Sequence, residues 1–145
     1  MKFLLSLYVF CCFIACEKSC APTKEPIAQS SKRVFFVNLK NGDKVTSPLE
    51  VVFGVEGMSV RKALEDLNDK TSGHHHILMD HPQGYIQEGH VIPMDDKHIH
   101  YGGAQTQGVI NLSPGKHTLS LQFADGAHLS YGKAMSATIS VEVLE

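Results

Sequence analysis

Cysteine is scarce in this chain of 145 residues, and all four cysteines lie at or before position 20. Cys11 and Cys12 lie in an apolar leader, Cys16 follows it directly, and Cys20 lies in the polar stretch beyond. Because no cysteine occurs from Arg33 onward, no disulfide stabilises that part of the chain and no thiolate there binds a metal. Any metal site in the folded part must therefore use His, Asp, Glu, Met or backbone oxygen ligands.

The sequence also lacks an excess of charge and lacks the common catalytic motifs. Thirteen basic and 15 acidic residues give a net charge of −2, and the lysines are scattered rather than clustered. A nucleic-acid partner is therefore not expected, because such proteins usually present a clustered basic face. There is no G-x-S-x-G, P-loop or G-x-G-x-x-G motif, and no serine or cysteine lies in a recognisable nucleophile context.

The longest apolar run, Phe3 to Ala15, has thirteen residues and is almost unbroken. A bilayer-spanning helix needs about 20 apolar residues, so this run fits a signal peptide better. It ends in FIAC, which resembles a bacterial lipobox, where a peptidase cleaves before the cysteine and the thiol carries the lipid. An ordinary secretory signal cleaved near Ala21 is the alternative. Both interpretations predict export to the cell envelope, and the first predicts a membrane anchor at Cys16, on the periplasmic or outer-membrane face.

The domain organisation follows from this leader. We expect a signal peptide over residues 1–15, a lipidated cysteine and flexible tether over residues 16–32, and one folded domain over residues 33–145. The tether is polar and contains two prolines and almost no large apolar side chain, which is typical of a flexible linker.

Alternating apolar residues predict an all-β fold. Leu49, Val51, Phe53 and Val55 share one face of a strand, and similar alternation recurs towards the C-terminus. We expect strands over residues 33–38, 49–55, 73–80, 98–101, 107–112, 117–123 and 137–143. About seven short strands predict an antiparallel immunoglobulin-like β-sandwich. Its predicted core comprises Phe36, Phe53, Leu119, Leu121, Ile139 and Val141.

Two segments break the β pattern. Val60, Leu64 and Leu67 lie at i, i+4 and i+7 with charges between them, which predicts a short amphipathic helix within residues 58–70. Residues 81–97 contain two prolines and two glycines and predict a long loop. Long loops in compact domains often carry function.

Histidine is the residue type that is clustered in one part of the sequence. All nine histidines lie between positions 74 and 128, and the segments GHHHILMD (73–80) and DKHIHYG (96–102) hold five of them. Because side chains alternate along a strand, His74 and His76 share one face, and His98 and His100 also share a face. His75 points the other way, together with Ile77 and Met79.

Two His-x-His pairs on neighbouring strands predict a metal site. Neutral imidazole binds Cu(II) and Zn(II) well, so we expect His74, His76, His98 and His100 to hold one such ion. The further candidates, as ligands or as groups that orient ligands, are His75, Asp80, Asp125 and His128. The alternative is that the histidines only form hydrogen bonds, to backbone carbonyls and to Asp80, Asp95 or Asp96. His117 lies in phase with buried leucines and is expected to be structural.

Several segments together are similar to a known family: GVEGM (54–58), GHHHILMD, DDKHIHYGGAQT (95–106), LSPGKHTLSLQFADGAH (112–128) and MSATISVEV (135–143). They resemble the bacterial domain-of-unknown-function family 4399, over about residues 34–143. The resemblance implies a small envelope domain with a histidine-rich signature, and it implies no particular reaction.

Three function classes remain open from the sequence. The first is an envelope-anchored metal-binding module for buffering, delivery or sensing of Cu(II) or Zn(II). The second is a non-catalytic structural or protein-interaction sandwich whose histidines are hydrogen-bonded. The third is a metal-dependent enzyme. Residues 76–81 approach the H-x-H-x-D-H pattern of binuclear zinc hydrolases, but Leu78 replaces the second histidine. Four imidazoles favour holding a metal over activating water, because a catalytic zinc keeps one position open.

Overall fold

The computed structural model describes residues 31–145; the expected signal peptide, Cys16 and most of the tether lie outside this range. Within it, no helix is long and apolar enough to cross a bilayer. The regular elements are nine strands and one 3₁₀ turn, in the order β1 (Arg33–Phe36), β2 (Asp43–Val45), β3 (Leu49–Glu56), β4 (Ser59–Val60), β5 (Ser72–Met79), β6 (His98–Tyr101), β7 (Gln107–Ile110), β8 (Gly115–Ala124), η1 (Lys133–Met135) and β9 (Ser136–Val143).

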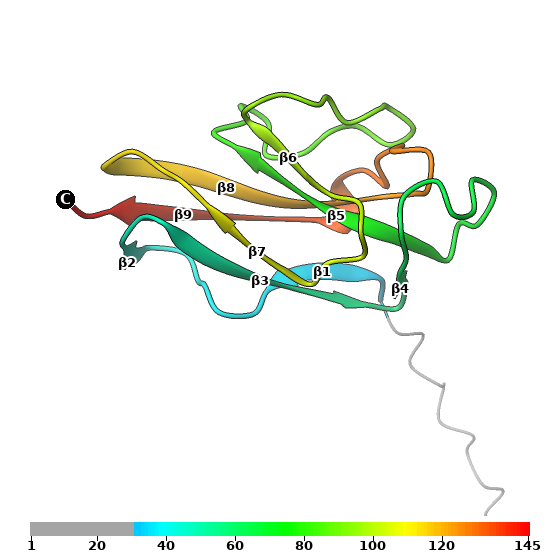
Figure 1. The fold of residues 1–145 in the computed structure, drawn as a ribbon, viewed down its shortest axis with the longest axis horizontal. Coiled ribbons are helices and arrows are strands. Elements are labelled where there is room, and N and C mark those ends of the chain that lie inside the picture. Colours follow the sequence, from blue (N-terminus) through cyan, green and yellow to red (C-terminus); the bar gives the residue numbers. More distant parts are fainter. Residues whose placement is uncertain (1–30) are drawn as a thin grey trace, which may run out of the picture.

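The strands form two sheets that lie one above the other (Figure 1). The smaller sheet has the order β1-β3-β7, and the larger has the order β2-β9-β8-β5-β4, with β6 also paired to β5. Most pairs are antiparallel, whereas β2 with β9 and β4 with β5 are parallel. The predicted all-β sandwich is therefore confirmed, and the short strands β2 and β4 are additions to the seven expected.

The core lies between the two sheets and follows the predicted alternation. Phe53 of β3 faces Leu119 and Leu121 of β8 across this space, and all three are buried. Val141 of β9 is buried as well, whereas Phe36 and Ile139 are partly buried and pack against the same cluster. Alternate residues of each strand thus supply the apolar layer, as a two-sheet sandwich requires.

The helix expected within residues 58–70 is wrong: the segment forms β4 and a series of turns. Several of its backbone N–H groups bond to distant carbonyls instead of forming a helical series, with Arg61 donating to Gly73, Ala63 to Gly102 and Leu64 to Gly126. Leu64 has a left-handed φ of 64°, which an α-helix does not contain. Leu64 and Leu67 are exposed, so the apparent amphipathic stripe covers no core.

The predicted long loop, residues 81–97, packs over the outer face of the larger sheet. Its Ile86 and Ile92 cover Leu78 and Ala124, which form a second apolar cluster there. The buried Gln122 of β8 accepts a hydrogen bond from the N–H of Ile86 at 3.1 Å. A polar side chain on a sheet face therefore fixes this loop above the strands that carry the histidines.

Candidate metal centre

Three imidazoles of the candidate centre come from two paired strands, β5 and β6. His74 and His76 of β5 project from the outer face of the larger sheet and are fully buried. The register pairs His76 with His100 of β6, so these two side chains point the same way and lie side by side. The nitrogen atoms of His74, His76 and His100 that are able to bind a metal all lie within 4.8 Å of one another.

A fourth imidazole, that of His128, comes from the loop after β8. Nε2 of His128 lies 3.1 Å from Nε2 of His100, and its ring centroid lies 4.9 Å from that of His74. His128 has a left-handed φ of 64°, and its backbone N–H donates a hydrogen bond to the backbone carbonyl of Asp125 at 3.0 Å. The sequence named His128 as a further candidate; the structure brings it into contact with the other three.

The buried carboxylate of Asp125 shapes this loop. Oδ1 accepts hydrogen bonds from the N–H groups of Ala127, at 2.9 Å, and Leu129, at 3.0 Å. Oδ2 forms an ion pair with Lys70. Because the carboxylate is occupied by these donors, Asp125 positions the backbone beside His128 rather than offering itself as a ligand.

The distances within the four-histidine cluster (His74, His76, His100 and His128) match those around one metal ion. Nε2 of His74 lies 3.0 Å from Nε2 of His76. Two imidazole nitrogens bound at about 2.0–2.1 Å to a tetrahedral ion lie about 3.3 Å apart. The ring centroids within the cluster are separated by 4.8 to 6.0 Å. Three of these residues, His74, His76 and His100, therefore have nitrogen atoms close enough together to hold one ion, and His128 lies beside them.

Burial favours the neutral form of three of these imidazoles, those of His74, His76 and His100. Loss of hydration lowers the pKa of His76 to about 2 and that of His74 to about 4, and the neighbouring imidazoles add to both shifts. Burial also lowers the pKa of His100, assisted by His128. Neutral imidazole is the form that binds a metal, so these ligands need lose no proton near neutral pH.

The structure places His98 away from the cluster. The register pairs it with Leu78 rather than with a histidine. Its Nδ1 lies 2.7 Å from Oδ1 of Asp95, an arrangement that the hydrogen-bonding alternative anticipated. Of the four predicted ligands, the structure brings together His74, His76 and His100. His128, rather than His98, lies beside them.

Two further candidate residues also have other partners. His75 lies on the core face, with its ring centroid 5.2 Å from that of Phe53 and 4.8 Å from that of Phe123. Asp80 accepts hydrogen bonds from the N–H of Thr118 at 2.8 Å and from Nδ1 of His117 at 2.9 Å. Neither side chain reaches the four-histidine cluster.

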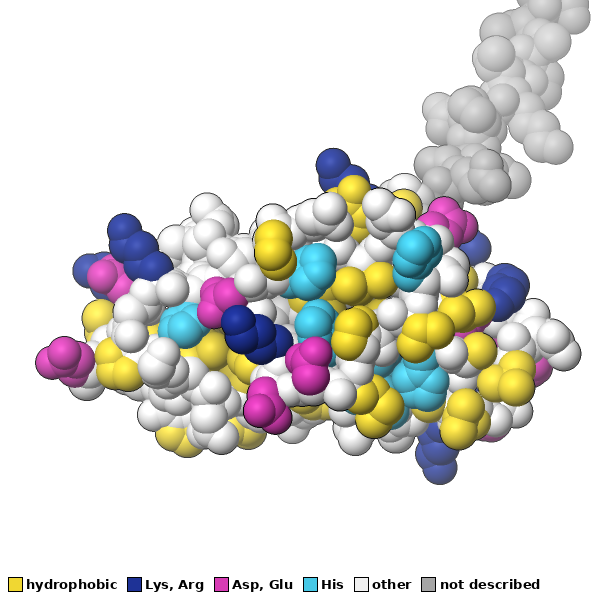
Figure 2. Space-filling model, turned by 90° about the horizontal axis from the view of Figure 1, so that it is seen from above, with side chains coloured by type: hydrophobic (Ala, Val, Ile, Leu, Met, Phe, Trp, Pro, Cys, Tyr) yellow, Lys and Arg dark blue, Asp and Glu magenta, His cyan; other side chains and the backbone are white. Residues whose placement is uncertain are grey.

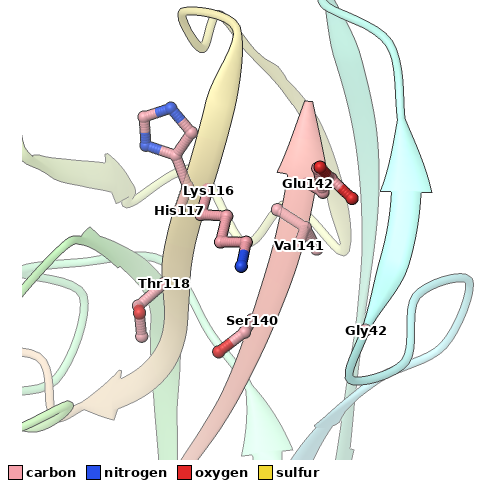
Figure 3. A pocket seen from close by; sticks show the side chains of 7 residues that line it. All are labelled: Gly42, Lys116, His117, Thr118, Ser140, Val141 and Glu142. Atoms are coloured by element: carbon pink, nitrogen blue, oxygen red, sulfur yellow. The ribbon is translucent and has the colours of Figure 1, made fainter. Parts of the chain in front are cut away.

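A surface hollow of about 390 Å³ lies along β8 and β9, and Figure 3 shows the side chains that line it. Lys116 and His117 project to opposite sides of β8 there. The ring of His117 is tied to Asp80 and, through Nε2, to the carbonyl of Ser113 at 2.9 Å. These bonds give His117 the structural role expected of it, and none of the clustered histidines lines the hollow.

Figure 2 shows the molecule from above, the side on which β6 and the 81–97 loop lie in Figure 1. Histidine and hydrophobic side chains alternate across this face. His74 and His76 are fully buried, whereas His100 and His128 are partly exposed. Solvent therefore reaches the cluster from the side of His100 and His128.

A family model described as Domain of unknown function (DUF4399) matches residues 51–144, which include every residue of the four-histidine cluster. The chain belongs to this family. No curated protein and no solved structure matches the chain.

Proposed function

We propose that this DUF4399 domain is a metal-binding module that holds one Cu(II) or Zn(II) ion through His74, His76, His100 and His128. The observation that carries the proposal is the convergence of four imidazoles from β5, β6 and the loop after β8, with Nε2–Nε2 separations of 3.0 and 3.1 Å. Its role is to hold the ion for buffering, delivery or sensing.

The hydrogen bonding of the buried rings supports this proposal over a purely structural role. Nδ1 of His74 and Nδ1 of His76 are buried and have no hydrogen-bond partner among the described residues. Leaving a buried polar atom unsatisfied costs about 1–3 kcal/mol. Apolar residues would not incur this cost. An ion held at the facing Nε2 atoms, 3.0 Å apart, does not bond to Nδ1, but its binding free energy would offset the cost of burying the two rings.

The donor set favours borderline transition metals. The four side chains offer nitrogen only, and Mg²⁺ and Ca²⁺ require oxygen ligands. Imidazole suits Cu(II), Zn(II) and Ni(II), and the Irving–Williams order places copper highest in affinity. Binding strength in the test tube therefore ranks the ions without identifying the one used in the cell.

The closed donor set favours storage or transfer over catalysis. A catalytic zinc usually has three protein ligands and an open position for water or substrate. In the proposed set the imidazole of His128 would fill the remaining position, and the partly exposed His100 and His128 leave a side from which a second ligand set can approach. Such an arrangement suits exchange of the ion.

The test is calorimetric titration of the purified, tag-free protein with Cu(II) and with Zn(II). Wild type is compared with His100→Ala/His128→Ala, chosen because these two rings are partly exposed and their loss disturbs packing least. His90→Ala, which removes an exposed histidine from the 81–97 loop, is the matched control. We expect the tightest binding step to weaken at least a hundredfold in the double variant and to stay unchanged in the control.

The opposite result is clear-cut. If the double variant is folded by circular dichroism and keeps the wild-type affinity, the four histidines are structural residues and the proposal fails. The proposal also fails if the wild-type protein binds Cu(II) and Zn(II) no more tightly than a scrambled histidine-rich peptide does.

We also propose that the module is anchored to the cell envelope through a lipid on Cys16, the residue that follows the apolar run Phe3–Ala15. We expect the protein in the membrane fraction, and we expect Cys16→Ser to release it or to block its maturation. Cys20→Ser is the matched control and should leave the distribution unchanged. Mass spectrometry that finds a mature N-terminus beyond Cys16 contradicts the anchor but not the export.

A further inference from the structure

His98 and His81 form a second pair of imidazoles on the same side of the larger sheet. His81 follows β5 directly after Asp80, and His98 begins β6. Their ring centroids are 5.7 Å apart, within the 4.8 to 6.0 Å range of the four-histidine cluster. Two imidazoles bound to one ion place their centroids roughly 5–6 Å apart, given metal–nitrogen distances of about 2.0–2.1 Å.

Asp95 orients the ring of His98. Oδ1 lies 2.7 Å from Nδ1 of His98 and also accepts the N–H of Lys97 at 2.8 Å. These hydrogen bonds, with the bond from His98 as the largest cause, lower the pKa of Asp95, so it is a carboxylate at neutral pH. A carboxylate accepts but does not donate, so Nδ1 of His98 is the donor, and in the neutral ring Nε2 is the nitrogen that is free to bind a metal. Carboxylates hold metal-binding histidines in this way.

Each ring of the pair has one buried nitrogen with nothing to bond. Nε2 of His98 and Nδ1 of His81 are buried and have no hydrogen-bond partner among the described residues. The side chain of His98 is 12% exposed, so water has little access to it. A hollow of about 350 Å³ is lined by His98, His100 and the exposed Met94.

We propose that His81 and His98 form a second metal site, oriented by Asp95, that takes the same borderline ion as the four-histidine cluster but binds it more weakly. Two protein ligands leave positions open for water or for a ligand from a donor or acceptor molecule, and this accounts for the weaker binding. His98 and His100 are two residues apart on one strand face, so the two ions would lie roughly 7 Å apart. The second site thus stands beside the partly exposed edge of the cluster, where an ion enters or leaves.

The two sites share no ligand, so each proposal can fail alone. The experiment titrates the purified, tag-free protein with Cu(II) and records both heat and electron paramagnetic resonance. We expect wild type to bind two ions in a tight and a weak step. His81→Ala/His98→Ala should keep the tight step and lose the weak one, whereas His100→Ala/His128→Ala should do the reverse. Asp95→Asn should weaken the second step about 10- to 100-fold.

A measurement on wild type removes the risk that a variant misfolds. A second equivalent of diamagnetic Zn(II) should shift the imidazole NMR signals of His81 and His98, and the signal of the exposed His90 should stay in place. One ion per chain in wild type, a weak step that survives in His81→Ala/His98→Ala, or a shift at His90 instead each overturns the second site. A His81→Ala/His98→Ala protein that loses the tight step and keeps the weak one also overturns the assignment.

Discussion

His76 is the most enclosed of the four clustered imidazoles. Its ring is fully buried, and burial with its imidazole neighbours lowers its pKa to about 2. Protons therefore compete little for its lone pair, and the strand on either side fixes its direction. His128 differs, because a loop carries it and Asp125 holds that loop through backbone hydrogen bonds. The cluster thus combines three imidazoles that are carried by strands with one that is carried by a loop.

Gly102 offers a way to disturb the cluster without removing a ligand. A Cβ at this position would overlap the ring of His100, at Cε1 and Nε2. We expect Gly102→Ala to turn the ring away from its partners and to weaken Cu(II) binding about tenfold or more, as loss of a ligand's orienting contacts does. The neighbouring Gly103→Ala is the matched control, since its Cβ would meet only the flexible end of Gln105. Equal titration curves for the two variants would show that the position of the His100 ring does not matter.

At the scale of elements, the strand phases were predictable and the register between strands was not. The alternation in β3, β5, β8 and β9 shows which residues face the core, and the structure agrees. A single site built from the two His-x-His pairs needs His74 opposite His100 and His76 opposite His98. The observed pairing is shifted by two residues, with His76 opposite His100 and Leu78 opposite His98. The long 81–97 loop between β5 and β6 leaves room for more than one register, and no local pattern distinguishes them.

Segment 61–70 shows how tertiary contacts override a local pattern. Arg61 pairs with Asp66 at 3.3 Å and with Asp69 at 3.6 Å, so the charges that seemed to decorate a helix stabilise turns instead. Asp69 also accepts three hydrogen bonds from Thr71 and Ser72, which lower its pKa to about 2. The carbonyls of the histidine-bearing region satisfy the backbone of this segment, and sequence spacing alone cannot reveal them.

For the molecule as a whole, the buried histidines tie folding to pH. The unfolded chain binds protons at these side chains near pH 6.5, whereas burial lowers the folded-state pKa to about 4 for His74 and His75 and to about 2 for His76. Between these values the unfolded state binds more protons, so the free energy of unfolding falls as the pH drops. Each such histidine contributes a slope of about 1.4 kcal/mol per pH unit. The proposed metal would oppose this loss, because its four-histidine site exists only in the folded state.

His75 allows this linkage to be measured apart from metal binding, because it lies in the core rather than in the four-histidine cluster. Both of its ring nitrogens are buried between Phe53 and Phe123 and have no hydrogen-bond partner within residues 31–145. His75→Leu therefore breaks no hydrogen bond, and it should raise the free energy of unfolding at pH 7.5 by about 1–3 kcal/mol. It should also flatten the pH dependence between pH 6.5 and 4 by about 1.4 kcal/mol per unit, since one proton-binding group of the unfolded chain is removed.

Urea unfolding of the metal-free protein, followed by circular dichroism at several pH values, measures both effects. His90→Ala is the matched control: it removes an exposed histidine, and its stability curve should keep the wild-type slope. A His75→Leu protein that loses stability at pH 7.5 while remaining folded would mean that the imidazole makes a favourable polar contact in the core. An unchanged slope would mean that His75 binds its proton equally in both states, and the acid sensitivity would then rest on His74 and His76.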